Sequence, residues 1–318
     1  MSLFPARDNL AIALVPFLWS APTRAVTPDP DLLALIPPGT QILAGINPAP
    51  PGRWHRRFLL ITRKCALDME DFGSLSGMDP ARDIHQVLFV AQQGVPPTVE
   101  EHGILVSGRF DQARIYRSAL DGGARNAEYR GIHVVEIQPF ARERGVDQIR
   151  WLAILQSNVL LFGTVETVKE ALDQKFAPGA QDSRLVQNLA ALRRDDDAWS
   201  IVVGTRNSGI RGALAALSPE LAAMADGKVL RLGIRYGRQI EFEYAVDSSS
   251  QSGKPHSDSA WSLPGRSAHG SFSLLPRLKF DGTREGGAHG TFKVSPERYD
   301  RWIDEVSHGE NQQRLSTP

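Results

Sequence analysis

The chain repeats one hydrophobic pattern three times: a short apolar run that ends in glycine and precedes a candidate helix start. The runs span residues 104–108, 159–163 and 201–204. A few apolar residues between breakers are typical of a buried strand, and glycine has no Cβ to hinder a sharp change from extended to helical backbone. Asp111, Thr164 and Asn207 or Ser208 are the candidate N-caps. The pattern predicts repeated strand–strand–helix units.

Two hairpins follow from the spacing of apolar residues. Residues 151–155 and 159–162 are apolar nearly throughout, which is typical of strands covered on both faces and central in a sheet. In residues 229–246, apolar and charged residues alternate. Pairing Arg235 with Glu241 requires a three-residue loop or a bulge, and it keeps every apolar residue on one side. The other, polar face of this hairpin is predicted to meet water.

Helices are predicted where leucines recur at helical spacing or where a capping residue precedes proline. Asp29-Pro30 begins a helix. The others are predicted at 67–75, 111–120, 164–176, 183–194 and after residue 204, and further strands at 41–46, 87–91 and 132–137. Together these elements predict an α+β fold of mostly antiparallel sheets with helices packed on one face. We expect two related lobes, residues 29–178 and 179–247.

The two ends of the chain differ from its centre. Residues 1–25 place Arg7 before an apolar run at 10–19 and small residues after it, which is typical of a secretory signal. The run is too short for a transmembrane span, which needs about 20 apolar residues. We therefore expect a periplasmic or secreted protein, or a cytoplasmic one if the segment is retained.

From residue 248 apolar periodicity is lost. Residues 248–318 are predicted to form a flexible tail rich in Gly, Ser and His, in which 296–306 allow a short helix. The abrupt change also fits a shifted reading frame or a degenerated end.

Composition narrows the function classes. The 318 residues carry 36 basic and 36 acidic side chains, so no net field favours nucleic acid or an anionic membrane. Cys65 is the single cysteine, which excludes an intrachain disulfide and a four-thiolate metal site. His256, His269 and His289 lack the spacing of a helical metal site. We predict no metal and no cofactor.

Three segments together resemble uncharacterised exported proteins of acidobacterial type. They are Leu-Leu-Ala-Leu-Ile-Pro-Pro-Gly-Thr at 32–40, Gly-Met-Asp-Pro-Ala-Arg-Asp-Ile at 77–84 and Gly-Arg-Phe-Asp at 108–111. The resemblance covers residues 31–246. It implies export, a mixed repeat of sheet and helix, and a non-enzymatic role. Because that family has no established activity or catalytic residue, the resemblance transfers no site residue.

The sequence lacks the common motifs of known enzymes. Gly73-Ser74-Leu75-Ser76-Gly77 has leucine where a nucleophile elbow needs serine, and no phosphate loop or dinucleotide fingerprint is present. The acidic run 195–197 is interpreted as a solvated loop. Asp79 and Asp83 flank Pro80 and could act as paired carboxylates, but Asp-Pro favours a turn. No catalytic, cofactor-binding or metal-binding residue is therefore assigned.

Three hypotheses about function remain. The first is an exported bacterial binding or scaffold module that acts through contacts with an envelope protein. The second is a carrier of an apolar small molecule between helix layer and sheet, which needs a cavity of roughly 300 Å³ or more. The third is a hydrolase that uses Asp79, Asp83 or His85, which requires these side chains to converge in a cleft. The sequence leaves the oligomeric state open.

Overall fold

A computed structural model describes residues 28–46, 79–92, 101–137, 149–179, 181–193, 196–203, 229–247 and 288–301. The strands are β1 (Ile42–Ile46), β2 (Ile84–Gln92), β3 (Glu101–Gly108), β4 (Arg125–Tyr129), β5 (Ile132–Ile137), β6 (Arg150–Leu155), β7 (Val159–Thr164), β8 (Ala198–Val203), β9 (Val229–Tyr236), β10 (Ile240–Asp247) and β11 (Ala288–Val294). The helices are α2 (Pro30–Leu33), α5 (Pro80–Asp83), α6 (Gln112–Asp121), α7 (Val165–Phe176) and α8 (Ser183–Ala190).

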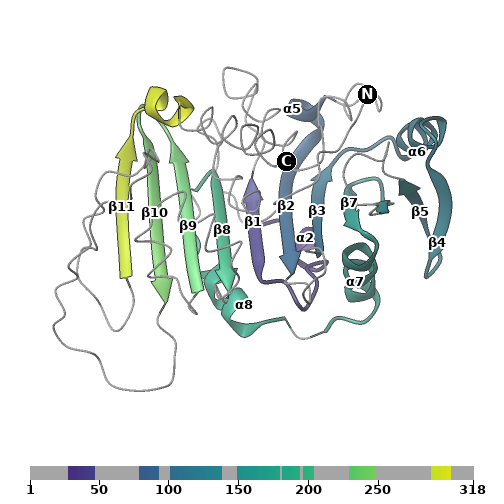
Figure 1. The fold of residues 1–318 in the computed structure, drawn as a ribbon, viewed down its shortest axis with the longest axis horizontal. Coiled ribbons are helices and arrows are strands. Elements are labelled where there is room, and N and C mark those ends of the chain that lie inside the picture. Colours follow the sequence, from purple (N-terminus) through teal and green to yellow (C-terminus); the bar gives the residue numbers. More distant parts are fainter. Residues whose placement is uncertain are drawn as a thin grey trace, which may run out of the picture.

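In the described ranges, the strands form one 11-stranded sheet in the order β11-β10-β9-β8-β1-β2-β3-β7-β6-β5-β4 (Figure 1). Every neighbouring pair is antiparallel. The predicted α+β class with an antiparallel sheet is thus confirmed. The repeated units and the two lobes are not confirmed, because β1 pairs with both β2 and β8. This pairing joins strands from before and after residue 179 in a single hydrogen-bonded ladder.

Helices α2, α7 and α8 bury their apolar side chains in one core cluster on one face of the sheet. Leu32, Val168, Leu172 and Leu185 from these helices share that cluster with sheet residues that include Trp199. The central strands are buried on their other face as well, since every residue of β1, β7 and β8 is buried. The hairpin of β6 and β7 lies inside the sheet, as its apolar pattern predicted.

Several local predictions are confirmed in detail. Asp29, Asp111 and Thr164 each accept a hydrogen bond from a backbone N–H of the helix that they cap. In the β9–β10 hairpin, Arg235 lies opposite Glu241 across a three-residue loop. The charged face of this hairpin also carries ion pairs: Glu243 accepts from Arg193 at 3.1 Å, and Glu241 from Lys293 at 3.2 Å.

The glycine at the end of β3 has a different role from the one predicted. Gly108 does not have a positive φ. A Cβ at this position would lie 2.3 Å from the carbonyl oxygen of Asp83, and the next residue, Arg109, donates its N–H to that same oxygen at 2.7 Å. Glycine is needed here because another backbone segment passes close by, which the local sequence does not reveal.

Both edge strands were missed. Every residue of β4 is exposed or half-buried, and only Ala127 and Tyr129 alternate with polar residues, a pattern too short to predict a strand. The signal was the turn at Arg130 and Gly131, whose φ values of 51° and 76° suit a tight hairpin.

Part of the predicted tail is ordered in the sheet. β11 pairs with β10, and Phe292 stacks on Phe242 with ring centroids 4.6 Å apart. Residues 296–301 are helical, and the fully buried Tyr299 shares a hydroxyl hydrogen bond of 2.9 Å with Tyr236. The apolar positions of β11 and of this helix therefore pack on the β9–β10 hairpin instead of belonging to a flexible segment.

Several predictions lie outside the described residues. They concern the segment 1–25, the helix at 67–75, Cys65, the helix after residue 204, His256 and His269. Among the helices that are described, none combines the length and the hydropathy needed to cross a bilayer.

Candidate functional site

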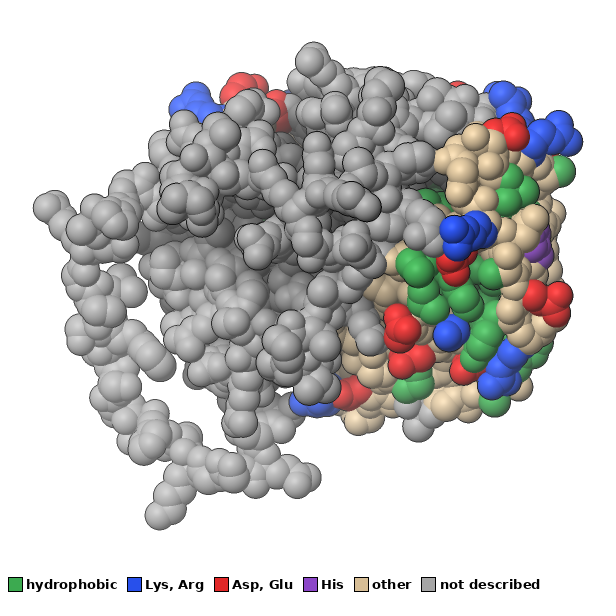
Figure 2. Space-filling view, turned by 45° about the vertical axis from the view of Figure 1, so that its right-hand side comes forward, with side chains coloured by type: hydrophobic (Ala, Val, Ile, Leu, Met, Phe, Trp, Pro, Cys, Tyr) green, Lys and Arg blue, Asp and Glu red, His purple; other side chains and the backbone are tan. Residues whose placement is uncertain are grey.

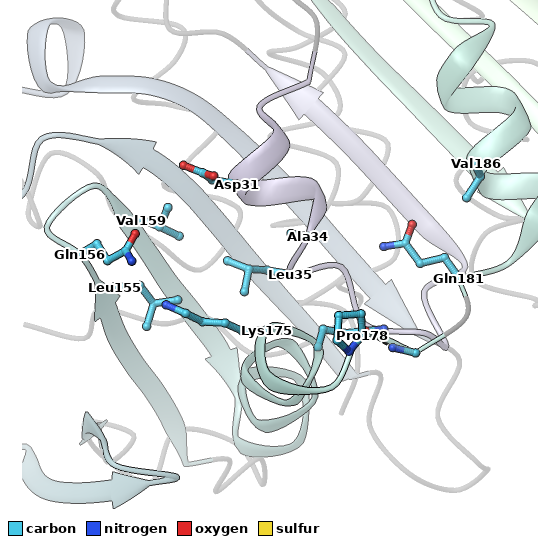
Figure 3. Close-up of a pocket in the computed structure, with 12 residues that line it drawn as sticks. Asp31, Ala34, Leu35, Leu155, Gln156, Val159, Lys175, Pro178, Gln181 and Val186 are labelled. Carbon is cyan, nitrogen blue, oxygen red and sulfur yellow. Dashed lines mark hydrogen bonds between the residues drawn. The ribbon is translucent and has the colours of Figure 1, made fainter.

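A cavity of about 530 Å³ lies at the C-terminal end of α7. Its walls come from α2 and the residues after it, from the turn between β6 and β7, and from α7 and α8 (Figure 3). Half of the lining residues are apolar: Ala34, Leu35, Leu155, Val159, Pro178 and Val186. The polar lining residues are Asp31, Gln156, Gln174, Lys175 and Gln181, together with Gly179. The volume falls within the range of about 300–1,000 Å³ that is typical of small-molecule sites.

The short helix α2 forms one wall because its capping signals place it there. Asp29 caps the first turn and Pro30 occupies the first helical position, where a proline costs no hydrogen bond. The helix ends at Ala34, whose side chain is exposed toward the cavity, while Leu35 is buried beside it. Gln181 ties this wall to the chain before α8, since its Nε2 donates to the carbonyl of Leu33 at 3.1 Å.

The turn between β6 and β7 forms the opposite wall in a strained conformation. Gln156 and Ser157 have φ values of 52° and 60°, a region that non-glycine residues adopt at a cost of roughly 1 kcal/mol or more each. Two contacts from outside hold the turn. Gly108 N–H donates to the carbonyl of Asn158 at 2.8 Å, and Phe110 N–H donates to that of Ser157 at 3.0 Å. The strand-to-helix junction after β3 therefore fixes the wall on which Gln156 lies.

Gln174 is the distinctive polar group of the cavity. The residue is 4% exposed, and its Oε1 accepts a hydrogen bond of 2.6 Å from the N–H of Gly179. Among the residues that the structure describes, none accepts a hydrogen bond from its Nε2. A buried amide donor without a partner costs about 1–3 kcal/mol, so buried amides are normally satisfied by protein, water or a ligand.

Charges of both signs stand at the rim of the cavity. Lys175, in the last turn of α7, and Asp31, in the first turn of α2, are both exposed. Figure 3 shows Lys175 extending from α7 toward Leu155. Figure 2 shows this end of the molecule, where hydrophobic side chains gather with charged side chains around and among them. The lining of the cavity thus combines apolar side chains, the buried residue Gln174 and charged side chains at the entrance.

The residues of the hydrolase hypothesis lie elsewhere. Asp83 accepts a hydrogen bond from the N–H of Asp79 at 2.8 Å and pairs with Arg82 at 2.8 Å. The hydrogen bond from Arg82 lowers the pKa of Asp83, although its partial burial opposes this. His85 is exposed on β2, and none of the three predicted residues lines the cavity. The carboxylate of Asp83 therefore closes the turn of α5, and these residues form no catalytic cluster with the cavity.

The other candidate residues take part in contacts that stabilise the fold. His289 pairs with Glu243 at 3.2 Å on the edge of the sheet. In the described ranges, no three His, Cys, Asp or Glu side chains gather closely enough for a metal ion. The acidic run was predicted to be a solvated loop, but Asp196 and Asp197 are buried. Asp197 accepts a hydrogen bond of 2.8 Å from the N–H of Tyr236, so it satisfies the end of β9.

Sequence reasoning missed the cavity residues. Gln174 lies in an ordinary amphipathic helix, and no motif surrounds it. The one available signal was a glutamine placed in line with Val168, Ala171 and other buried residues of α7, since a polar residue on an apolar face needs a partner.

Known proteins offer no relative from which a function can be inferred. No protein-family model matches the chain, and no curated protein matches it. Solved structures of a protein designated TP0453 match much of the chain at low identity. Crystal form I shares 9% identity at a TM-score of 0.46, over 88% of this chain and 99% of that one. Crystal form IV shares 10% identity at a TM-score of 0.42, over 72% and 81%. Similarity of this degree carries no argument about this protein.

Proposed function

We propose that this protein binds and carries an apolar small molecule in the cavity between α2, α7, α8 and the β6–β7 turn. The observation that carries the proposal is a cavity of about 530 Å³, half of whose lining residues are apolar. A concave, mostly apolar site with few polar groups is the usual form of a small-molecule site. This function class is the second of the three hypotheses from the sequence, where it rested on the apolar stripes of the predicted helices.

Filling the cavity is expected to abolish binding of an apolar probe. Ala34→Trp places an indole in the cavity from an exposed position, so it should leave the core intact. We expect full-length protein to bind N-phenyl-1-naphthylamine saturably, and the variant to bind it at least about tenfold more weakly, or about 1.4 kcal/mol. The measurement is a fluorescence titration of both proteins.

Ala191→Trp is the matched control for this experiment. Ala191 is also an exposed helix C-cap in the αR conformation, but it does not line the cavity. Its variant should bind the probe as the unmodified protein does. Absence of saturable binding by the unmodified protein, or equal binding by both tryptophan variants, would sink the proposal.

We further propose that this carrier is exported. The support is the order of charge, apolar run and small residues in 1–25. Intact-mass spectrometry of protein purified from native cells tests it: a mature chain that begins near Val26 is expected, and a mass that retains Met1 contradicts export.

In the scaffold hypothesis, the exported protein acts through protein–protein contacts. Fewer structural observations support it than support the carrier hypothesis. Phe176 and Val186 are the exposed large hydrophobic residues of the described ranges, at 49% and 46%. Single exposed side chains of this kind are common on protein surfaces. Crosslinking in the cell envelope is the measurement for that hypothesis, and the cavity gives the carrier hypothesis the firmer basis.

A further inference from the structure

We propose that the edge strand β4 is the docking site for a second copy of this chain, and that the two β4 strands pair antiparallel across a two-fold axis at Ala127. β4 ends the sheet on one side (Figure 1), and within the described ranges it pairs only with β5. The inference goes beyond the proposed function and does not depend on it, because no residue of β4 lines the cavity.

The backbone of β4 directs two of its residues toward the open side. The two-residue turn at 130–131 has positive φ at both positions, as in a type I′ hairpin, so Tyr129 and Ile132 form the hydrogen-bonded pair that closes it. Hydrogen-bonded and non-hydrogen-bonded pairs alternate along an antiparallel ladder. Asn126 and Glu128 therefore point their N–H and C=O groups away from β5.

These outward backbone groups are free to pair with another strand. In the described part of the chain, no backbone hydrogen bond outside the β4–β5 ladder involves Asn126 or Glu128, and both residues are exposed. Natural sheets protect such an edge with proline, lysine, a bulge or a covering segment. β4 contains no proline and no lysine, and its register with β5 is unbroken. The edge can therefore accept a strand.

The side chains of β4 select one register for two copies. Residues with outward backbone groups must lie opposite each other. An axis at Glu128 sets two like charges face to face, which is unfavourable. An axis at Asn126 places the partner's Glu128 opposite Ala124, outside the strand. An axis at Ala127 uses all five residues of β4 and sets Asn126 opposite the partner's Glu128.

This register is self-complementary, as a two-fold contact must be. Asn126 and the partner's Glu128 can exchange both of their backbone hydrogen bonds, and the symmetry repeats the exchange. The Oδ1 atom of Asn126 accepts from Nε2 of His133 at 2.8 Å, which leaves its NH₂ group to donate to the carboxylate of the partner's Glu128. On the opposite face, Arg125 lies beside the partner's Tyr129, where a guanidinium and an aromatic ring attract each other.

Sedimentation equilibrium of the unmodified full-length protein tests the contact. We expect a monomer–dimer equilibrium with a dissociation constant on the order of 100 µM or tighter at about 50 mM salt, because a contact limited to edge strands is small and charge-dependent. A chain that remains monomeric up to about 500 µM overturns the proposal.

Two opposite substitutions at residue 126 test the register. Asn126→Lys sets a cation opposite the partner's Glu128 and should tighten the dimer by about threefold or more, whereas Asn126→Glu sets like charges there and should weaken it by about fivefold or more. Both variants lose the same bond from His133, so the sign of the change reports on the facing charge. Combining Asn126→Glu with Glu128→Lys reverses the charge pair and should restore a dimer at least as tight as the original, to within about twofold.

Gln239→Glu is the control for charge. Gln239 is exposed in the β9–β10 loop, and these strands lie in the other half of the sheet from β4. The same added charge should change the dissociation constant by less than about twofold there. Glu128→Pro removes only an outward N–H, as proline on an edge strand does, and should abolish the dimer. It replaces Asn126→Glu if thermal unfolding shows that this variant is not folded.

Two further results overturn the proposal. If the protein dimerises and no substitution at residues 126 and 128 changes the dissociation constant, the dimer forms through another surface. If Gln239→Glu weakens the dimer as much as Asn126→Glu does, net charge accounts for the effect, and the facing pair of Asn126 and the partner's Glu128 does not.

Discussion

Gly45→Ala is expected to lower the free energy of unfolding by about 3 kcal/mol, the upper end of the usual cost of overpacking a core. Gly45 lies in β1, directly opposite Trp199 of β8. A Cβ on Gly45 would stand 2.3 Å from two carbon atoms of the indole ring, closer than any real contact. Trp199 is 1% exposed, so the rigid ring has no space into which to move. Urea denaturation followed by tryptophan fluorescence measures the change.

Gly237→Ala is the control for this substitution. Gly237 lies in the β9–β10 loop, where a Cβ would meet only the carbonyl oxygen of Gln239 at 3.5 Å. Its replacement should change stability by less than about 0.5 kcal/mol. Trp199→Leu supplies the second arm, because a smaller side chain should relieve the clash. In the double variant Gly45→Ala with Trp199→Leu, we expect the total loss of stability to be at least about 1 kcal/mol smaller than the sum of the losses in the two single variants. A total equal to that sum contradicts a direct clash.

Tyr116→Phe is expected to cost about 2–3 kcal/mol of stability, because one hydroxyl serves two backbone groups. The Tyr116 hydroxyl donates to the carbonyl of His133 at 3.0 Å and accepts from the N–H of Ile154 at 2.9 Å. These two backbone groups lie on β5 and β6, next to the paired residues Val134 and Ala153. The hydroxyl of Tyr116, on α6, therefore bridges the two strands where their own hydrogen bonding ends. Burial raises the pKa of Tyr116, and the hydroxyl remains a donor over the physiological range.

Tyr129→Phe is the control, because it removes a tyrosine hydroxyl that bonds to a side chain and not to the backbone of two strands. Tyr129 is half-buried, and its hydroxyl donates to the carboxylate of Asp173 at 2.9 Å. Solvent can replace this bond, so the loss should remain near or below about 1 kcal/mol. Thermal or urea unfolding of both variants measures the two losses of stability. Equal losses in the two proteins mean that the hydroxyl of Tyr116 has no special place in the sheet.

The elements that sequence predicted best are those whose signals lie within a few residues. The register of the β9–β10 hairpin depends on the alternation of Leu232, Ile234, Phe242 and Tyr244 with charged residues. A slip of one residue would turn all of these side chains to the opposite face, which is why the pairing of Arg235 with Glu241 could be predicted, with a three-residue loop or a bulge to allow it. The caps at Asp29 and Thr164 are equally local, since each bonds to an N–H within three residues.

The candidate site was not predictable in this way. Leu35 lies far along the chain from Gln156 and Gln174, and no one of the three residues carries a motif. Gln174 accepts a hydrogen bond from the N–H of Gly179 and also belongs to the lining of the cavity. Both facts depend on how the segment after α7 returns past that helix, which no spacing of residues reveals.

The sequence by itself determined the α+β class, the caps, the β9–β10 register and the position of β6 and β7 inside a sheet, because these follow from local hydrogen bonding and from the period of apolar residues. Only the tertiary structure decided that one sheet unites the predicted lobes through β1 and β8. It also decided that Gly45 must lack a side chain and that β11 completes the edge beside β10. These features arise from contacts between segments that are distant along the chain, where the close packing of particular atoms, not a local pattern, selects the residue.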